Sequence, residues 1–319
     1  MTDPRPDPTP ADPSGVDMTG MGPVGVDRTA VKTTGPDPSR PETTQQDATR
    51  RTEPFDPARA SGYPDPPPRM GFFTDTSVCI GCKACEVACK EWNQVPEDGL
   101  NLLGMSFDNT GELSANTWRH VAFIEQRRPD GDLRWLMSSD VCKHCTRAGC
   151  LDVCPTGALF RTEFGTVVVQ EDICNGCGYC IPACPYGVIG QRAGDGRAWK
   201  CTLCYDRIGA GLMPACAQAC PTESIQYGPL DELRARAEAR LQHLHAQGET
   251  SARLYGHDPN DGVGGDGAFF LLLDEPEVYG LPPDPQVPTR NLPKMWKRAG
   301  LAALSMAVAA VAAFIGRRR

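Results

Sequence analysis

The chain has 319 residues, 16 of them cysteine, and a formal net charge of −8. The acidic balance, and the lack of a basic stripe interleaved with aromatic residues, argue against a nucleic-acid surface. All the cysteines lie within residues 79–220. A Cys-x2-Cys pair can close as a redox disulfide, but a third cysteine three residues further on has no local partner, so the pattern predicts metal centres.

Residues 1–70 are rich in Pro, Asp, Thr and Gly and contain almost no apolar clusters. Such a stretch buries too little apolar surface to offset the entropy lost on ordering, so we expect a disordered tail. Arg50 and Arg51 form a pair of arginines, but no apolar run follows them. The pair therefore does not indicate a signal peptide.

The cysteines form four motifs of four. Motifs one and three have the spacing Cys-x2-Cys-x2-Cys-x3-Cys, the bacterial ferredoxin signature of a 4Fe–4S cluster. Motif two has a wider middle gap, and eleven residues split motif four. Gly81, Gly176 and Gly178 leave room for backbone N–H groups to approach the sulfurs. In chain order the motifs are Cys79, Cys82, Cys85, Cys89; Cys142, Cys145, Cys150, Cys154; Cys174, Cys177, Cys180, Cys184; and Cys201, Cys204, Cys216, Cys220.

Zinc is the alternative metal for these thiols, since a pair such as Cys201 and Cys204 would fit a zinc ribbon. Tetrahedral zinc sites usually combine two such pairs, whereas the loops here hold three closely spaced cysteines. No run has the Cys-x3-Cys-x2-Cys spacing of radical SAM enzymes. The spacing therefore favours four cubane clusters.

The last cysteine of each motif in a two-cluster ferredoxin ligates the cluster of the other motif. We expect motifs two and three to exchange their last cysteines, and motifs one and four to do so around them. The predicted fold class is α+β, with one ferredoxin-like double-cluster unit nested inside another. The predicted ligands are a first set, Cys79, Cys82, Cys85 and Cys220; a second set, Cys142, Cys145, Cys150 and Cys184; a third set, Cys174, Cys177, Cys180 and Cys154; and a fourth set, Cys201, Cys204, Cys216 and Cys89.

Segments outside the motifs predict helices and strands. Between motifs one and two, "RHVAFIEQ" and "RPDGDLRWLMSS" flank a Pro-Asp-Gly turn and predict a hairpin. A short strand is expected at 165–170, an exposed helix after residue 229, and a buried strand at 267–275. We assign 71–230 to the four-cluster region. Residues 231–293 would be a helix, a strand and a Pro-rich segment that pack on that region or on a partner.

No catalytic constellation is evident in the sequence. His144 lies between Cys142 and Cys145, where a spacer role is favoured because the cysteine set is already complete. "GVGGDG" at 262–267 precedes an expected strand and does not open a helix, so it is not a dinucleotide-binding loop. We therefore expect no catalytic site on this chain.

Residues 299–316, "AGLAALSMAVAAVAAFIG", carry no charge and one polar side chain, Ser305. As a helix this segment would rise roughly 27 Å, close to the bilayer core of about 30 Å. A buried core helix is the alternative. We favour a transmembrane anchor within 294–319, and basic residues at both ends leave its orientation open.

Taken together, these features resemble the iron–sulfur (beta) subunit of membrane-bound formate dehydrogenase, part of a wider family serving molybdenum and tungsten enzymes. The resemblance covers about 70–316 and leaves out the N-terminal tail. It rests on "CIGCKACEVACKEWN" at 79–93, "TWRHVAFIE" at 117–125, the cysteine-rich run at 142–180, and "GAFFLLLDEPEVYGLP" at 267–282.

The resemblance implies four 4Fe–4S clusters, since all sixteen cysteines are intact where nitrate reductase subunits replace one with tryptophan. It implies a molybdopterin-bound Mo or W alpha subunit that oxidises formate, and a membrane cytochrome b (gamma) subunit or quinone that accepts the electrons. It places the motif-one cluster nearest the catalytic subunit and the motif-four cluster nearest the membrane. It also favours a single-pass membrane protein whose soluble part lies outside the cytoplasm through co-export with the catalytic subunit.

Three alternatives stay open. The protein could be the equivalent subunit of another molybdopterin oxidoreductase or of a hydrogenase. It could belong to a soluble formate dehydrogenase that delivers electrons to nicotinamide. It could also be a zinc-binding assembly module without a redox role.

Overall fold

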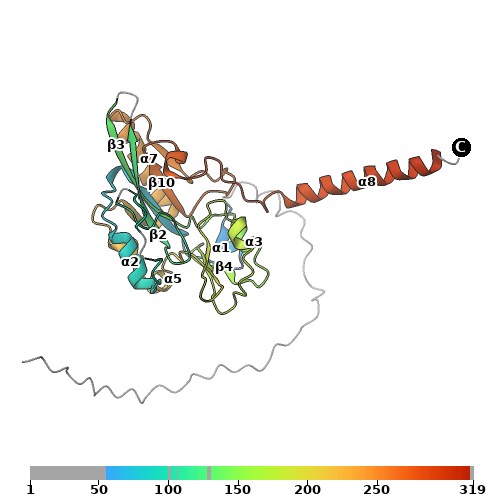
Figure 1. The fold of residues 1–319 in the computed structure, drawn as a ribbon, viewed down its shortest axis with the longest axis horizontal. Helices are drawn as coiled ribbons and strands as arrows, with labels where there is room; N and C mark the ends of the chain where they lie inside the picture. Colours follow the sequence, from blue (N-terminus) through green and yellow to red (C-terminus); the bar gives the residue numbers. More distant parts are fainter. Residues whose placement is uncertain (1–54, 100–101, 106, 128–130, 317–319) are drawn as a thin grey trace, which may run out of the picture. The chain divides into compact units, whose positions relative to one another are not determined.

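The computed structural model describes residues 55–99, 102–105, 107–127 and 131–316. Most of the tail predicted to be disordered lies outside the described residues. Figure 1 shows the arrangement of the elements.

Residues 55–70, assigned to the tail on composition, are described with a short helix, α1 (Pro57–Ala60). Asp56 caps this helix by accepting hydrogen bonds from the first turn, and proline occupies its first position. Arg69 then donates to Thr146 Oγ1 at 2.6 Å and to His144 O at 3.0 Å. This stretch therefore contacts the cysteine-rich region, because the Arg69 guanidinium forms hydrogen bonds with residues of motif two.

A four-stranded sheet joins the two ends of the cysteine-rich region to the segment that follows it. Its order is β8 (Ile225–Pro229), β1 (Met70–Asp75), β10 (Ala268–Leu272) and β9 (Arg253–Tyr255). β1 runs parallel to β10 and antiparallel to β8, and β9 is antiparallel to β10. All five residues of β10 are buried, which confirms the buried strand predicted there. The sheet spans the boundary predicted between 71–230 and 231–293.

Helix α7 (Leu230–Ala246) packs against β1, β8 and β9 of this sheet (Figure 1). The predicted helix is present, and most of its residues are exposed as expected, but one face is buried. Leu230, Leu233, Ala237 and Leu244 are buried. Few apolar positions suffice because they fall on the one face that covers the sheet.

Three two-stranded hairpins complete the strands of the described residues. The first confirms the predicted hairpin, and β5 confirms the short strand expected at 165–170. The pairs are β2 (Arg119–Arg127) with β3 (Leu133–Val141), β4 (Leu159–Arg161) with β5 (Val167–Val169), and β6 (Gly190–Gln191) with β7 (Ala198–Trp199).

Short helices carry or flank most of the cysteines. Helix α2 of motif one packs against α6 of motif four, and α3 of motif two packs against α4 of motif three. This contact pattern is the nested arrangement predicted from the motif spacing. The helices are η2 (Thr76–Val78), α2 (Ala84–Asn93), α3 (Gly149–Asp152), α4 (Cys180–Ala183), α5 (Tyr205–Gly209), α6 (Ala215–Gln218) and η3 (Pro276–Tyr279).

Helix α8 (Leu292–Gly316) is apolar over most of its length. Within it, an 18-residue window of the segment Lys294–Ile315 has a mean hydropathy of 1.9, and the side chains of this segment are exposed. Such a helix spans roughly 33 Å, enough to cross the hydrocarbon core of about 30 Å. It is the one helix of the described residues that is long and apolar enough to cross a membrane.

Candidate metal centres

The first set of cysteines lines one pocket. Cys79, Cys82, Cys85 and Cys220 all contribute to its wall. The strands explain this convergence, because β1 ends just before motif one, and β8 begins just after the last cysteine of motif four. The two strands pair antiparallel, with Thr74 opposite Ile225, so the ends of the two motifs meet.

The loop of motif one needs a glycine at its second turn. Gly81 has φ +65°, and a Cβ at this position would lie 2.6 Å from Phe123 Cε1. The Gly81 N–H forms a hydrogen bond with the Cys79 sulfur. Burial raises the pKa of the Cys79 thiol, and this hydrogen bond partly offsets the effect. The predicted approach of a backbone N–H to a sulfur is therefore present here.

The second set lines another pocket. Cys142, Cys145, Cys150 and Cys184 form part of its wall, and the contact between α3 and α4 brings them together. Burial raises the pKa of Cys150 to about 12, and the neighbouring charges of Cys142 and Cys184 add to the increase. Thiols placed this closely resist ionisation unless a positive group accepts the thiolates.

The third set is grouped around Cys180. Burial raises the pKa of this thiol to about 11, and the charges of Cys174, Cys154 and Cys177 contribute. A backbone donor also reaches this set, since Ala198 N lies 3.5 Å from Cys174 Sγ.

The fourth set is the most enclosed, since all four of its cysteines are buried. Burial, followed by the charges of Cys201, Cys216 and Cys204, raises the pKa of Cys89. Cys89 thus lies with motif four although it belongs to motif one. Asn93 Nδ2 donates to Cys89 Sγ at 3.7 Å and to Cys204 Sγ at 3.8 Å.

The four sets follow one another in a row. Cys216 of the fourth set raises the pKa of Cys85 of the first, after burial. Cys142 of the second set does the same for Cys201 of the fourth. Cys180 of the third set also contributes to the raised pKa of Cys150 of the second, where burial is the main cause. The order is therefore first, fourth, second, third.

This order corrects one expectation from the sequence. The resemblance places the motif-four cluster nearest the membrane, at an end of the row, whereas the fourth set lies in the interior. The reason is the contact of α2 with α6, which holds motif four against motif one. The two cysteines classed as exposed, Cys82 and Cys177, belong to the first and third sets, at opposite ends of the row.

The donor chemistry of the sets fits 4Fe–4S clusters. Each set supplies four thiols, which is the ligand complement of such a cluster. Across the described ranges, no group of three His, Cys, Asp or Glu side chains could hold a single metal ion. In the first and second sets the thiols line the wall of a shared pocket, an arrangement suited to a cluster of several irons.

Comparisons with known proteins agree with this chemistry. Two family models, each described as a 4Fe–4S dicluster domain, match residues 78–158 and 133–230. The nitrate-inducible formate dehydrogenase iron–sulfur subunit of Escherichia coli is 42% identical over 229 residues, which are 70% of this chain and 76% of that protein. The chain belongs to the family of formate dehydrogenase iron–sulfur subunits. Its cofactors are 4Fe–4S clusters, and two dicluster domains with sixteen cysteines correspond to four of them.

The chain is similar to two further relatives. The formate dehydrogenase iron–sulfur subunit of Haemophilus influenzae is 44% identical over 67% of this chain and 68% of its own length. A polypeptide of the anaerobic dimethyl sulfoxide reductase of Escherichia coli is 38% identical over 52% of this chain and 76% of its own length. The formate dehydrogenase subunits thus match more of the sequence.

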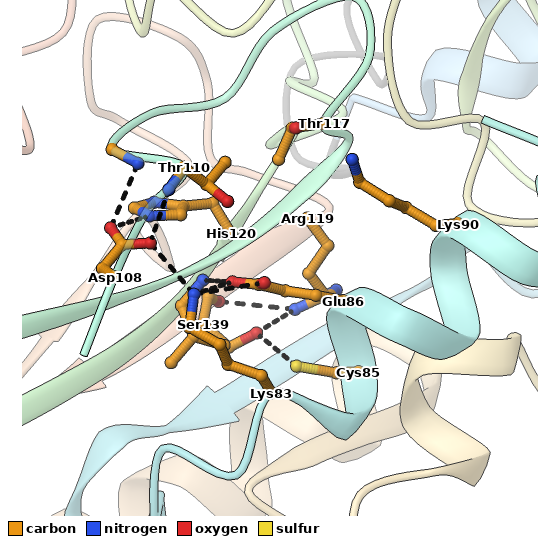
Figure 2. Close-up of polar contacts among 12 residues, drawn as sticks. Lys83, Cys85, Glu86, Lys90, Asp108, Thr110, Thr117, Arg119, His120 and Ser139 are labelled. Carbon is orange, nitrogen blue, oxygen red and sulfur yellow. Dashed lines mark hydrogen bonds and ion pairs between the residues drawn. The ribbon is translucent and has the colours of Figure 1, made fainter. Parts of the chain in front are cut away.

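A buried polar network surrounds the motif-one loop of this formate dehydrogenase-type subunit (Figure 2). Asp108 accepts from Lys83 Nζ at 3.0 Å and lies 2.7 Å from His120 Nε2. Glu86, on α2, accepts a hydrogen bond from the N–H of Val121 in β2. These contacts fix the start of α2 against the hairpin and so hold the motif-one loop in place.

The sequence predicts a spacer role for His144, and in the structure one nitrogen of its buried ring is engaged by the backbone. Its Nδ1 accepts a hydrogen bond from the Val167 N–H at 3.1 Å. Burial, and then the charges of Lys200 and Arg161, lower the pKa of the ring well below its ordinary value, so the ring is neutral.

Sequence reasoning missed several residues that contact the cysteines. Asn93 could have been found, because it lies four residues after Cys89 on one helix and therefore on the same face. Arg119 and Ser139 gave no such signal. They lie in strands far from any motif-one cysteine in the sequence, and only the fold brings Ser139 to Cys85 and Arg119 to Ser139.

Proposed function

We propose that this protein relays electrons from formate oxidation in a catalytic subunit, through a row of four 4Fe–4S clusters, to an acceptor in the membrane. The row of cysteine sets carries the proposal. The fourth set is wholly buried inside the row, and each of the two end sets has one exposed cysteine. An electron-transfer chain needs accessible clusters at its two ends, where partners exchange electrons, and an interior that is closed to solvent.

The proposed ligands are the four sets predicted from the sequence. When bound, 4Fe–4S clusters supply one-electron carriers, whose potentials depend on hydrogen bonds to sulfur, charge and exposure. The protein supplies the thiolates and the backbone and side-chain donors that approach them. It also supplies the packing that keeps water from the interior. Among the donors are the Gly81 and Leu203 N–H groups and the Asn93 amide.

The relatives support formate as the source of electrons. A formate dehydrogenase subunit matches 70% of this chain, against 52% for the dimethyl sulfoxide reductase polypeptide. We propose a catalytic alpha subunit with molybdopterin-bound Mo or W at the Cys82 end of the row. At the other end, a membrane cytochrome b (gamma) subunit or quinone would accept the electrons.

The segment that leads into α8 supports the third set as the membrane end. Thr289 donates to Asp152 of α3. A Cβ on Gly149, also in α3, would lie 3.2 Å from Val287 Cγ1. Helix α8 therefore starts from a segment packed against α3, which holds the second and third sets together. A helix anchored there would bring that end of the row to the membrane.

We further propose that α8 is a single-pass anchor and that the cluster-bearing part lies outside the cytoplasm, carried across the membrane with the catalytic subunit. Protease added to sealed, right-side-out vesicles should then cleave the exposed segments around Phe107 and Leu133. Protection of both segments, with cleavage only after lysis, would contradict this orientation.

The relay is tested in the complex purified anaerobically from membranes. Formate should reduce the clusters of this protein, detected as EPR signals, and a quinone analogue should then oxidise them. A complex whose catalytic subunit reduces a dye with formate while the clusters stay oxidised would rule the relay out. Iron and acid-labile sulfide measured on the same sample would separate that result from simple loss of clusters.

A further inference from the structure

Arg119 is the largest fully buried side chain in the described residues, with 1% of it exposed. It begins β2, and its Nη1 donates to Ser139 Oγ at 3.0 Å and to Ser139 O at 3.3 Å (Figure 2). The guanidinium carbon lies 5.0 Å from the centre of the Phe72 ring. Its other two nitrogens, Nε and Nη2, have no hydrogen-bond partner among the described residues.

Ser139 connects Arg119 to the first set of cysteines. Ser139 Oγ lies 3.2 Å from Cys85 Sγ. Because this oxygen accepts a hydrogen bond from Arg119, its own hydrogen is free to point at the sulfur. Figure 2 shows dashed lines from the Ser139 hydroxyl oxygen both to the Arg119 guanidinium and to the Cys85 sulfur. Arg119 therefore polarises a hydrogen bond to a ligand of the first cluster.

The charge of Arg119 also interacts with the fourth set. Burial lowers the pKa of Arg119, but the charges of Cys216, Cys85, Cys201 and Cys89 raise it, and the balance lies above the ordinary value. Three of those cysteines belong to the fourth set and one to the first. The guanidinium thus lies among cysteines of both sets, whose sulfurs are thiolates when they ligate clusters.

A buried charge with unpaired donors is costly unless something compensates it. Two unpartnered nitrogens in a fully buried fork indicate a negatively charged group that the thiols bind. Two thiolate-ligated clusters satisfy that requirement. Reduction adds an electron to a cluster, so a fixed positive charge beside it favours the reduced form.

We propose that Arg119 is a positioning residue that raises the reduction potentials of the first and fourth clusters together, through Ser139 for the first and through its free nitrogens for the fourth. The proposal rests on the ligand sets given under the proposed function. The first and fourth clusters would then have similar reduction potentials, because the same positive charge raises both. Electron transfer from the first cluster to the fourth would therefore involve little change in free energy.

The test is an anaerobic redox titration of the purified complex with chemical mediators, followed by EPR, in the absence of formate. Cys82→Ser and Cys204→Ser first assign the signals of the two clusters. Arg119→Gln removes the charge and leaves a polar side chain, and Arg119→Lys keeps the charge. Ser139→Ala removes the hydroxyl between Arg119 and Cys85.

We expect Arg119→Gln to lower the reduced-to-oxidised ratio of both clusters at least tenfold at the wild-type midpoint. For a one-electron couple this corresponds to about 59 mV. Ser139→Ala should shift the first cluster alone, and Arg119→Lys should leave the fourth near wild type. Arg134→Gln is the matched control, since Arg134 bonds to Leu273 O at 3.0 Å on the outer part of the same hairpin.

Unchanged ratios in Arg119→Gln with a full iron content would overturn the proposal. If Arg119→Gln loses iron, the potentials measured in Ser139→Ala and Arg119→Lys test the proposal. An unshifted first cluster in Ser139→Ala, or a fourth cluster in Arg119→Lys that shifts as far as the first, then overturns it. Because the mediators replace formate, a complex that fails to oxidise formate still reports these potentials. The relay and the role of Arg119 thus fail separately.

Discussion

His120 Nε2 lies 2.7 Å from Asp108 Oδ2, with only 7% and 2% of the two side chains exposed. The second carboxylate oxygen, Oδ1, accepts from Lys83 Nζ at 3.0 Å and from the backbone N–H of Thr110 at 3.0 Å. The carboxylate thus joins the loop before β2, the strand itself and the motif-one loop (Figure 2). One buried side chain links three parts of the protein around the first set.

Replacing Asp108 with Asn should destabilise the protein at neutral pH. Burial raises the pKa of Asp108, but the hydrogen bonds from His120, Thr110 and Lys83 lower it to about 2, from 3.8. A depressed pKa means that the ionised form stabilises the fold above about pH 4, and that this contribution disappears as the pH falls toward 2. We expect Asp108→Asn to lose about 1–2 kcal/mol in urea unfolding at neutral pH, with the difference narrowing only below about pH 4.

Asp65→Asn, at an exposed position, is the control for that measurement. It should change the free energy of unfolding by less than about 0.5 kcal/mol. An equal loss in both variants would mean that the contacts of Asp108 contribute nothing specific.

Gly81→Ala should cost the protein its first cluster. The substitution adds a Cβ at φ +65° and 2.6 Å from Phe123 Cε1, so the loop or the ring has to move. Gly187→Ala is the matched control, because Gly187 also has φ +65° but has nothing within 4 Å of the added atom. The backbone cost of about 1–2 kcal/mol is therefore common to both.

Iron analysis and EPR distinguish the two glycine variants. Gly81→Ala should lose about a quarter of the iron and the signal of one cluster. Gly187→Ala should keep all of it. Full iron content in both would show that the motif-one loop tolerates the displacement.

The spacing of the cysteines predicts four cluster sites because the spacing is a local property of the sequence. Three thiols in one loop and a fourth on the following helix can be found from sequence alone. The exchange of last cysteines between motifs follows from a rule about two-cluster ferredoxins. In the structure Cys220 lines one pocket with Cys79, and Cys89 lies near Cys201, as that rule requires.

What the sequence could not supply depends on tertiary packing. The order of the row is set by the contact of α2 with α6, between segments more than a hundred residues apart. The buried face of α7 was missed because only four of its seventeen residues, Leu230, Leu233, Ala237 and Leu244, are buried. Arg119 was missed because a charged residue at the start of a strand is ordinarily exposed, and only the fold encloses it.

Cys89→Ser should damage the fourth cluster and spare the first. Cys89 belongs to motif one by sequence, but the charges of Cys201, Cys216 and Cys204 surround it. Cys85→Ser is the matched comparison, since both cysteines lie on α2 and are 4% and 6% exposed. It should damage the first cluster instead. If both variants alter the same EPR signal, the exchange of last cysteines between motifs one and four is wrong.

Deleting residues 292–319 should release the protein from the membrane with its clusters intact. The side chains of Lys294–Ile315 are exposed, so their removal takes no packing from the cysteine-bearing region. We expect the truncated protein in the soluble fraction with unchanged iron per polypeptide.

A point variant tests anchoring without removing any residues. Ala307→Arg places a charge near the helix centre at a cost of about 2.5–3.5 kcal/mol for insertion, so this variant should also leave the membrane. Ala307→Leu should stay in carbonate-washed membranes, and retention of the truncated protein there would mean that a partner subunit holds it in place of α8.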